Sequence, residues 1–201
     1  ENWALITRAV YLMCKIITSE CKLEKNESLK TVLCIGSGGH TTELLRLFKA
    51  LDSKKYNPRM YIIADNDTNS EDKIHELEKA IEGKYEISRI PRSRNVHQSY
   101  ISSVKTTLYS ILLTIPVINS FKPDVIFCNG PGTCIPICLV SFLFRCLFIL
   151  DCRIIFVESI CRVLSLSLTG KILQFFADIV VVQWAPLKQV CFRAKYFGRL
   201  T

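Results

Sequence analysis

A glycine-rich turn is the segment of this sequence whose residue types and spacing are best suited to chemistry. Residues 31–43 read TVLCIGSGGHTTE, in which an apolar run meets three glycines and a histidine just before a helical pattern begins. A strand that turns into a helix through glycines directs backbone N–H groups outward, and such groups bind phosphate. His40 could move a proton near neutral pH, or it could only cap the helix start. The pattern therefore favours an anion-binding loop over a turn without a ligand.

A dinucleotide-binding loop is an alternative for the same segment. Its pattern, G-x-G-x-x-G, would need a third glycine at position 41, which is Thr41. An acidic residue, Asp65, does follow the next predicted strand, as that pattern requires. The spacing therefore weakens an NAD(P)-binding module without excluding it.

Three other polar or glycine-rich segments follow predicted strands. Arg92 and Arg94 could clamp a phosphate, residues 128–132 (CNGPG) form a second glycine turn, and Glu158 could bind sugar hydroxyls or act as a base. Ligands of parallel sheets bind outside the carboxyl ends of the strands, so these segments and the first turn should converge on one rim. A solvated loop, a plain turn and a helix-start partner are the respective alternatives.

The order of the predicted elements indicates one α/β domain. Apolar strands without alternation imply burial on both faces, and strand–helix repetition implies a parallel sheet with right-handed crossovers. We therefore expect a single doubly wound, Rossmann-like sheet that is complete at Val182. The predicted strands are 31–36, 60–64, 85–90, 125–128, 154–157 and 179–182, and the predicted helices are 41–52, 69–82, 98–120, 133–148 and 167–177. The apolar stripe predicted for the helix 98–120 is Val104, Leu108, Ile111, Leu112 and Ile115.

The composition indicates a folded protein with anionic partners. The 201 residues are 49% hydrophobic and carry a net charge of +8, which suits a phosphorylated substrate, an anionic membrane or a nucleic acid. The ten cysteines include no C-x-x-C pair, and no histidine lies near Cys134 and Cys138, which are four positions apart. We therefore expect reduced thiols in a cytosolic environment and no metal site.

Residues 1–30 are predicted to form an amphipathic, membrane-associating segment followed by a polar linker. Arg8 and Lys15 interrupt its apolar residues, and two charges in so short a stretch argue against a full membrane span. An interfacial helix, the end of a longer anchor and a helix packed on the domain remain as interpretations. A second apolar run, 135–150, is predicted to be a buried helix whose region also helps to hold the protein at a membrane. The stripe predicted for the first helix is Trp3, Ile6, Val10, Met13 and Ile17.

Four strings in this chain resemble those of one known family. GSGGHTTELLRL, IPRSR, CNGPGTCIP and VESICRV occur in this order, as in the membrane-associated subunit of the two-part UDP-N-acetylglucosamine transferase. The resemblance covers about residues 30–201 and implies a fold like the N-terminal half of a two-domain, GT-B type glycosyltransferase. The implied reaction adds the second N-acetylglucosamine, β-1,4-linked, to dolichyl-diphosphate-GlcNAc. The implied location is the cytosolic face of the endoplasmic reticulum membrane, with the nuclear envelope membrane as a further one.

The resemblance also implies roles for the matched residues. It implies that the first glycine turn faces the lipid diphosphate of the acceptor, that the NGPG turn lies beside it, and that His40 and Glu158 are candidate catalytic residues. Neither a metal nor a cofactor is expected. With the two arginines, the expected acceptor-diphosphate site comprises Gly36, Ser37, Gly38, Gly39, His40, Thr41, Arg92, Arg94, Asn129, Gly130 and Gly132.

The expected partners follow from the size of the chain and from the resemblance. A transferase of this kind needs two Rossmann domains, whereas residues 31–201 hold one, so a nucleotide-sugar-binding catalytic subunit should complete the site. The chain alone should then be inactive. Lys188–Thr201 is predicted to dock that subunit, unless it forms a final strand or helix on its own domain. A lipid-linked diphosphate sugar and the endoplasmic reticulum membrane are the other expected partners, and nucleic acid is not. A pure membrane scaffold without site residues is the remaining alternative.

Overall fold

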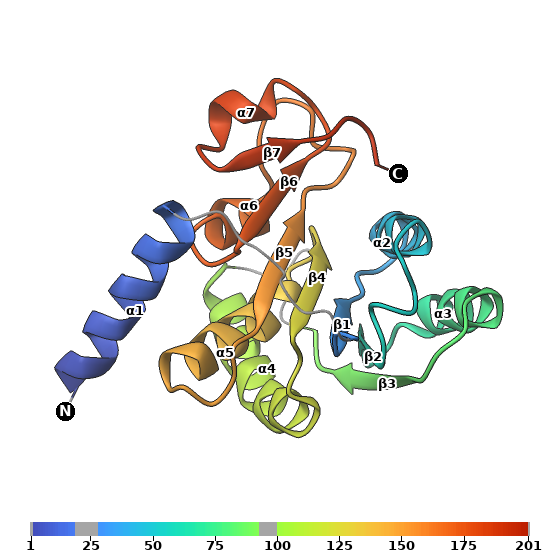
Figure 1. The fold of residues 1–201 in the computed structure, drawn as a ribbon, viewed down its shortest axis with the longest axis horizontal. Coiled ribbons are helices and arrows are strands. Elements are labelled where there is room, and N and C mark those ends of the chain that lie inside the picture. The colour runs from blue at the N-terminus through green and yellow to red at the C-terminus, as the bar shows by residue number, and fades with distance from the viewer. Residues whose placement is uncertain (1, 19–27, 93–99, 201) are drawn as a thin grey trace.

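A single parallel sheet organises the chain (Figure 1). The computed structural model describes residues 2–18, 28–92 and 100–200. Its seven strands lie in the order β3-β2-β1-β4-β5-β6-β7, with parallel pairing throughout. The strands are β1 (Thr31–Cys34), β2 (Arg59–Ala64), β3 (Tyr85–Ile90), β4 (Val125–Asn129), β5 (Arg153–Val157), β6 (Ile179–Val182) and β7 (Ala194–Tyr196).

Helices cover both faces of this sheet. In Figure 1, α2 and α3 lie on one face, and α1, α4, α5 and α6 lie on the other. Along β1 the side chains alternate between two buried clusters, since Val32 and Cys34 belong to one and Leu33 to the other. This double burial is what a strand without polar alternation predicts, and the doubly wound α/β prediction is confirmed. The helices are α1 (Asn2–Thr18), α2 (Gly39–Lys49), α3 (Thr68–Ala80), α4 (Tyr100–Phe121), α5 (Cys134–Cys146), α6 (Leu168–Leu173) and α7 (Leu187–Val190).

The prediction that the sheet is complete at Val182 is wrong. A further strand, β7, pairs with β6, from Val180 opposite Ala194 to Val182 opposite Tyr196. Arg193 fixes the start of this strand, because its guanidinium donates to the carbonyl oxygens of Ala177 at 2.6 Å and Asp178 at 3.1 Å. Three residues are too few to show a strand pattern in the sequence, so β7 is recognised only by its pairing with β6.

The helix α1 packs on the domain mainly through Leu12 and Ile16, which lie outside its predicted stripe, and Met13 is the stripe residue that packs beside them. Leu12 and Ile16 form a small buried cluster with Phe142 and Cys146 of α5. Most of the predicted stripe lies outward instead, and Trp3 is 80% exposed. The exposed members of that stripe are Trp3, Ile6, Val10 and Ile17. Residues 19–27, most of the predicted linker, lie outside the described residues.

The helix α4 divides its predicted stripe in a similar way. Ile111 and Ile115 pack against the core, whereas Leu112 is 63% exposed. The buried side includes Ser110 and Thr114, whose hydroxyls donate to the carbonyl oxygens of Pro91 at 3.1 Å and Ser110 at 2.7 Å. Because these hydroxyls are satisfied locally, they can face inward while leucines face outward. Ser103–Phe121 is long and apolar enough to cross a membrane by length and composition.

Candidate functional site

The loops after β1, β4 and β5 meet at the carboxyl edge of the sheet. These strands are neighbours, and the chain reverses its direction of travel across the sheet between β1 and β4. Such a reversal is where open parallel sheets bind ligands. A cavity of about 340 Å³ lies there, and His40, Gly130 and Glu158 line it. Its other lining residues are Gly39, Glu43, Ser159, Cys161, Arg162 and Ser167.

The first glycine turn leaves the start of α2 open. Gly38 precedes the helix with φ 64°, a left-handed backbone that favours glycine. Ser37, Gly38 and Gly39 are exposed, and a Cβ at Gly38 or Gly39 would meet nothing within 4 Å among the described residues. The first N–H groups of a helix have no acceptor within it, and they carry the positive end of its dipole. The turn can therefore accept an anion.

Two other glycines let the first and second turns interlock. A Cβ at Gly36 would lie 2.7 Å from Cγ of Pro131 and 2.8 Å from Cβ of His40. At Gly130, where φ is +63°, a Cβ would lie 2.6 Å from Cε1 of the His40 ring. Both positions therefore exclude a side chain. The imidazole is seated against the backbone of the second turn.

A chain of hydrogen bonds runs from His40 into the wall of the cavity. Nδ1 of His40 lies 2.9 Å from Oδ1 of Asn129, and Nδ2 of Asn129 donates to Oε2 of Glu43 at 2.9 Å. Ser159 Oγ donates to Oε1 of the same carboxylate, also at 2.9 Å. Asn129, predicted to bind the diphosphate, is 1% exposed, with its amide oxygen on His40 and its amide nitrogen on Glu43.

Glu43 is one of the site residues that the sequence analysis missed; the others are Ser159, Cys161, Arg162 and Ser167. Glu43 follows His40 by three positions, so both side chains lie on one side of the first turn of α2. The spacing of His40 and Glu43 was the feature of the sequence that could have identified Glu43. The role of Glu43 depends on its hydrogen bonds with Asn129 and Ser159, which lie 86 and 116 positions away.

Glu158 lies in the wall of the cavity, held by its own loop. Its carboxylate accepts hydrogen bonds from the backbone N–H of Ser159 at 3.1 Å and of Ser167 at 2.8 Å, and from the Ser167 hydroxyl at 3.0 Å. Burial raises the pKa of this carboxyl above its ordinary value, although these hydrogen bonds oppose the shift. A Cβ at Gly170 would clash with the carboxylate. Glu158 thus joins the end of β5 to the start of α6.

Of the ten described residues of the predicted diphosphate site, three line this cavity: Gly39, His40 and Gly130. The buried hydroxyl of Thr41 contacts the Gly36 carbonyl oxygen and Oγ of Ser70. Arg92 follows β3, which β2 separates from β1, and its Nε is buried without a hydrogen-bond partner among the described residues. Gly132 lies between β4 and α5, outside the lining. Arg94 lies outside the described residues.

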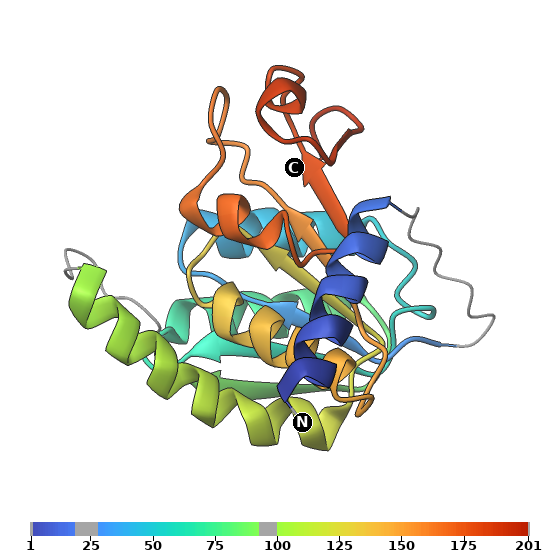
Figure 2. The ribbon, with the colours of Figure 1, turned by 90° about the vertical axis from the view of Figure 1, so that its left-hand side faces the viewer.

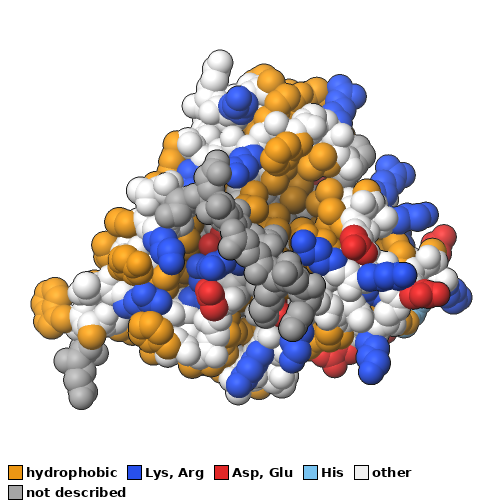
Figure 3. All heavy atoms as spheres, in the orientation of Figure 1, with side chains coloured by type: hydrophobic (Ala, Val, Ile, Leu, Met, Phe, Trp, Pro, Cys, Tyr) orange, Lys and Arg blue, Asp and Glu red, His pale blue; other side chains and the backbone are white. Residues whose placement is uncertain are grey.

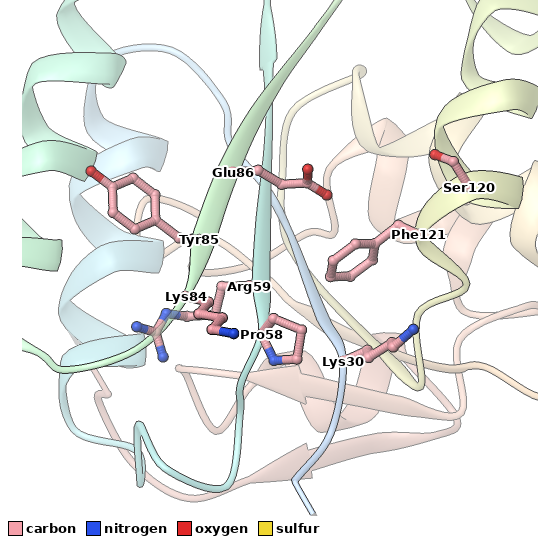
Figure 4. A pocket seen from close by; sticks show the side chains of 8 residues that line it. All are labelled: Lys30, Pro58, Arg59, Lys84, Tyr85, Glu86, Ser120 and Phe121. Atoms are coloured by element: carbon pink, nitrogen blue, oxygen red, sulfur yellow. The ribbon is translucent and has the colours of Figure 1, made fainter.

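A larger cavity, about 410 Å³, lies at the opposite edge of the sheet (Figure 4). Lys30, Lys84 and Tyr85 line it where β1 and β3 begin, and Phe121 closes it from the end of α4. The helix end there is a C-terminus, whose carbonyl groups carry the negative end of the dipole. This cavity lies where the strands begin, away from the loops after β1, β4 and β5. Within the described ranges, no group of three or more His, Cys, Asp or Glu residues could hold a metal ion.

Comparison with known sequences identifies relatives over almost the whole chain. Residues 31–200 match the family model described as "Oligosaccharide biosynthesis protein Alg14 like". A human protein named UDP-N-acetylglucosamine transferase subunit ALG14 is 46% identical, over 96% of this chain and 93% of the relative. Its counterpart of the same name in Schizosaccharomyces pombe is also 46% identical, over 81% of this chain and 79% of the relative.

Comparison with solved structures finds the same fold in larger proteins. A crystal structure of MurG from Acinetobacter baumannii superposes with a TM-score of 0.58 at 16% identity, covering 85% of this chain and 45% of that one. A UDP-N-acetylglucosamine 2-epimerase from Rickettsia bellii superposes with a TM-score of 0.51, covering 87% of this chain and 46% of that one. The chain therefore has the fold of about half of a two-domain GT-B protein.

Proposed function

This chain belongs to the Alg14 family, and from that premise we propose that it forms the acceptor side of a two-part N-acetylglucosaminyltransferase. The curated relatives are named as subunits of a UDP-N-acetylglucosamine transferase, so a catalytic partner is implied. The proposed reaction is the β-1,4 addition of the second N-acetylglucosamine to dolichyl-diphosphate-GlcNAc. The family assignment favours this function over an NAD(P)-binding module.

The observation that carries the proposal is the open start of α2 beside His40. The exposed turn at residues 37–39 offers unpaired N–H groups to a diphosphate, and His40 lines the adjoining cavity. The acceptor 4-hydroxyl would attack C1 of the donor sugar, the bond from C1 to UDP would break, and Nε2 of His40 would take the hydroxyl proton. Glu158 would shape the loop that closes the cavity from β5.

A partner is proposed to supply the nucleotide-sugar half. The fold corresponds to 45% of the MurG chain, and a second domain closing over the carboxyl edge would exclude water and complete the site. The docking surface is proposed to be the C-terminal tail, Lys188–Thr201. Phe197 is 66% exposed there, and Phe192 and Val190 are also exposed. Aromatic side chains are common anchors of interfaces.

The membrane contact is proposed to lie on the side of α1 and α4. Figure 2 shows both helices on one side of the molecule with α5 between them. Apolar side chains gather over α1 at the left margin of Figure 3. Between α1 and the loop after α5 lies a basic cavity of about 360 Å³, lined in part by Arg8, Lys15 and Phe148. A cation there gains about 1 kcal/mol near an anionic surface.

The central proposal is tested by activity with and without the partner. Purified chain alone should not turn over UDP-GlcNAc with a short lipid-diphosphate-GlcNAc acceptor, whereas the complex should. In the complex, His40→Ala should lower kcat by about 10²–10⁴-fold, the usual cost of losing a general base. His75→Ala is the matched control, because His75 is exposed on α3 and contacts Tyr85. Turnover by the chain alone would refute the division of labour, and a near-normal kcat for His40→Ala would refute its role as base.

A further inference from the structure

The hydrogen bonds around Asn129 determine the orientation of its amide. Glu43 receives Nδ2 of Asn129 at 2.9 Å, the Ser159 hydroxyl at 2.9 Å and the Ile160 N–H at 3.4 Å. A carboxylate only accepts hydrogen bonds, so the group of Asn129 that faces Glu43 must be the NH₂. A flipped amide would set an oxygen against the carboxylate. Glu43 therefore turns Oδ1 of Asn129 toward His40.

That orientation in turn selects the state of the imidazole. Oδ1 is an acceptor, so the ring nitrogen facing it, Nδ1 of His40 at 2.9 Å, must carry the hydrogen. A neutral imidazole with hydrogen on Nδ1 has its lone pair on Nε2. Nε2 has no hydrogen-bond partner in the described part of the chain, and His40 lines the cavity.

We propose that Glu43 is a positioning residue, which acts through Asn129 to hold His40 as the Nδ1–H tautomer with Nε2 free to accept a proton. The kinetic consequence rests on the proposed function, since it requires His40 to be the base. The tautomer does not, because it is a property of the resting protein. In the resting protein Glu43 is linked to His40 through the amide of Asn129, and its own carboxylate lines the cavity.

Other groups could act on His40, and the experiment must separate them from Glu43. The titratable and charged side chains that line the cavity with His40 are Glu43 on α2 and Glu158, Cys161 and Arg162 on the loop after β5. Cys134 of α5 also lies near His40: burial raises the pKa of its thiol, whereas hydrogen bonds with Cys128 and Cys34 and, to a smaller extent, His40 lower it. Of these groups, Glu43 is the one that the hydrogen bonds connect to the imidazole through Asn129.

The first experiment measures the tautomer directly. The chain has three histidines, so the ring nitrogens of ¹⁵N-labelled protein can be assigned by loss of the His40 signals in His40→Gln. The full-length wild type should show hydrogen on Nδ1. In Glu43→Ala the amide is free to turn its NH₂ toward the ring, and the hydrogen should move to Nε2. Wild type with hydrogen on Nε2 overturns the proposal without any variant, and so does a Glu43→Ala variant that keeps it on Nδ1.

The second experiment asks whether a neutral replacement restores the function. In Glu43→Gln the side-chain oxygen can still accept from Asn129, and its NH₂ can donate to the Ser159 hydroxyl. In the complex, Glu43→Ala should lower kcat about 10- to 100-fold, by analogy with other misplaced catalytic groups, with little change in KM for the acceptor. Glu43→Gln should recover most of that loss. The control is Arg46→Ala, an exposed position on the same helix, which should behave as wild type.

The two experiments fail in different ways. If His40 is not the base, the tautomer will still follow Glu43 while kcat does not, which refutes the proposed function and leaves the positioning intact. If Glu43 acts otherwise, kcat will fall without a change of tautomer, which overturns the inference. A double variant, Glu43→Ala with Asn129→Ala, should lose no more than the larger single loss, because both residues act through one chain of contacts. Additive losses would contradict that chain.

Discussion

Two regions of this molecule depart from the usual distribution of polar and apolar side chains, and they do so in opposite directions. At the carboxyl edge, Asn129 is 1% exposed and Glu158 is fully buried. On the side of α1 and α4, Trp3 is 80% and Leu112 is 63% exposed. Buried polar groups and exposed apolar patches are the informative exceptions in a folded protein. In the first region hydrogen bonds hold polar side chains inside the fold, and in the second region apolar side chains face outward.

The comparison separates two kinds of function that single substitutions can uncouple. Variants of the carboxyl edge should change turnover and leave membrane binding intact. Variants of α1 and α4 should change membrane binding and leave turnover intact. A variant that changes both would show that the two regions are not independent.

The largest expected effect is that of Gly130→Ala. The added Cβ would lie 2.6 Å from Cε1 of His40, at a backbone φ of +63° that disfavours a side chain. Because the imidazole would be displaced, kcat of the complex should fall about 100-fold or more. Flotation with anionic liposomes should be unchanged. Lys84→Ala in the larger cavity is the control and should keep normal turnover. A normal kcat for Gly130→Ala would show that the active site does not lie at the carboxyl edge.

Substitutions on α1 and α4 should give the next largest effect, and they should change only the flotation with liposomes. Trp3→Ser combined with Leu112→Ser removes exposed apolar area without touching the cluster of Leu12 and Ile16 that holds α1 on α5. Burial in lipid is worth about 25 cal/mol per Å², so the bound fraction should fall at least about tenfold. Turnover in detergent should stay normal. Unchanged flotation would show that the membrane contact lies on another part of the molecule.

The tail should show a smaller effect, on partner binding. Phe197→Ser removes an exposed aromatic ring and should raise the Kd for the partner about five- to tenfold, measured by copurification at graded concentrations. A point variant is needed because truncation after Phe192 would remove Arg193 and β7 and so disturb the sheet. Leu112→Ser is the control for this measurement, and Phe197→Ser is the control for flotation. An unchanged Kd would show that Phe197 of the tail does not contribute to partner docking.

The smallest expected effect concerns stability and pH. Since burial raises the pKa of Glu158 in the folded chain, its protonation contributes stability that is complete below the ordinary pKa of 4.5 and is lost as pH rises through the raised pKa. In Glu158→Gln the side chain stays neutral, so the Tm of this variant should decline less than that of wild type as the pH rises from 4.5 through the raised pKa of Glu158. Each 1 kcal/mol corresponds to about 2–4 °C in a chain of this size. Parallel Tm curves would mean that Glu158 titrates normally.

The strands of the core and the loops that follow them were predictable because their signals are local. Val32 and Leu33 belong to an apolar run without alternation, and glycines mark the turn that follows it. The third turn of the site, at Glu158, was also placed correctly beside the second. Arg92 was not, since its distance from β1 depends on the strand order β3-β2-β1. All four segments follow parallel strands of one sheet and lie at its carboxyl edge as predicted, but the cavity is lined from the three that follow β1, β4 and β5.

The faces of the helices were harder to predict than the helices themselves. A stripe of apolar residues shows that a helix is amphipathic, but it does not show which face meets the domain when a competing face is also apolar. On α4, the hydroxyls of Ser110 and Thr114 are buried because they find carbonyl oxygens within reach. On α1, Leu12 and Ile16 are buried because α5 offers Phe142 and Cys146. Both outcomes depend on neighbouring elements.

The sequence by itself determined that this chain forms a parallel α/β sheet with glycine turns at the ends of its strands, because periodicity, β-branched runs and glycines act within a few residues of one another. Only the tertiary structure decided that His40, Asn129, Glu43 and Ser159 meet. Asn129 and Ser159 lie 86 and 116 positions from Glu43, and they are brought to it by the order β1-β4-β5 in the sheet. A hydrogen bond depends on distance and direction in space, and for residues so far apart in sequence both are set by the packing of the whole sheet.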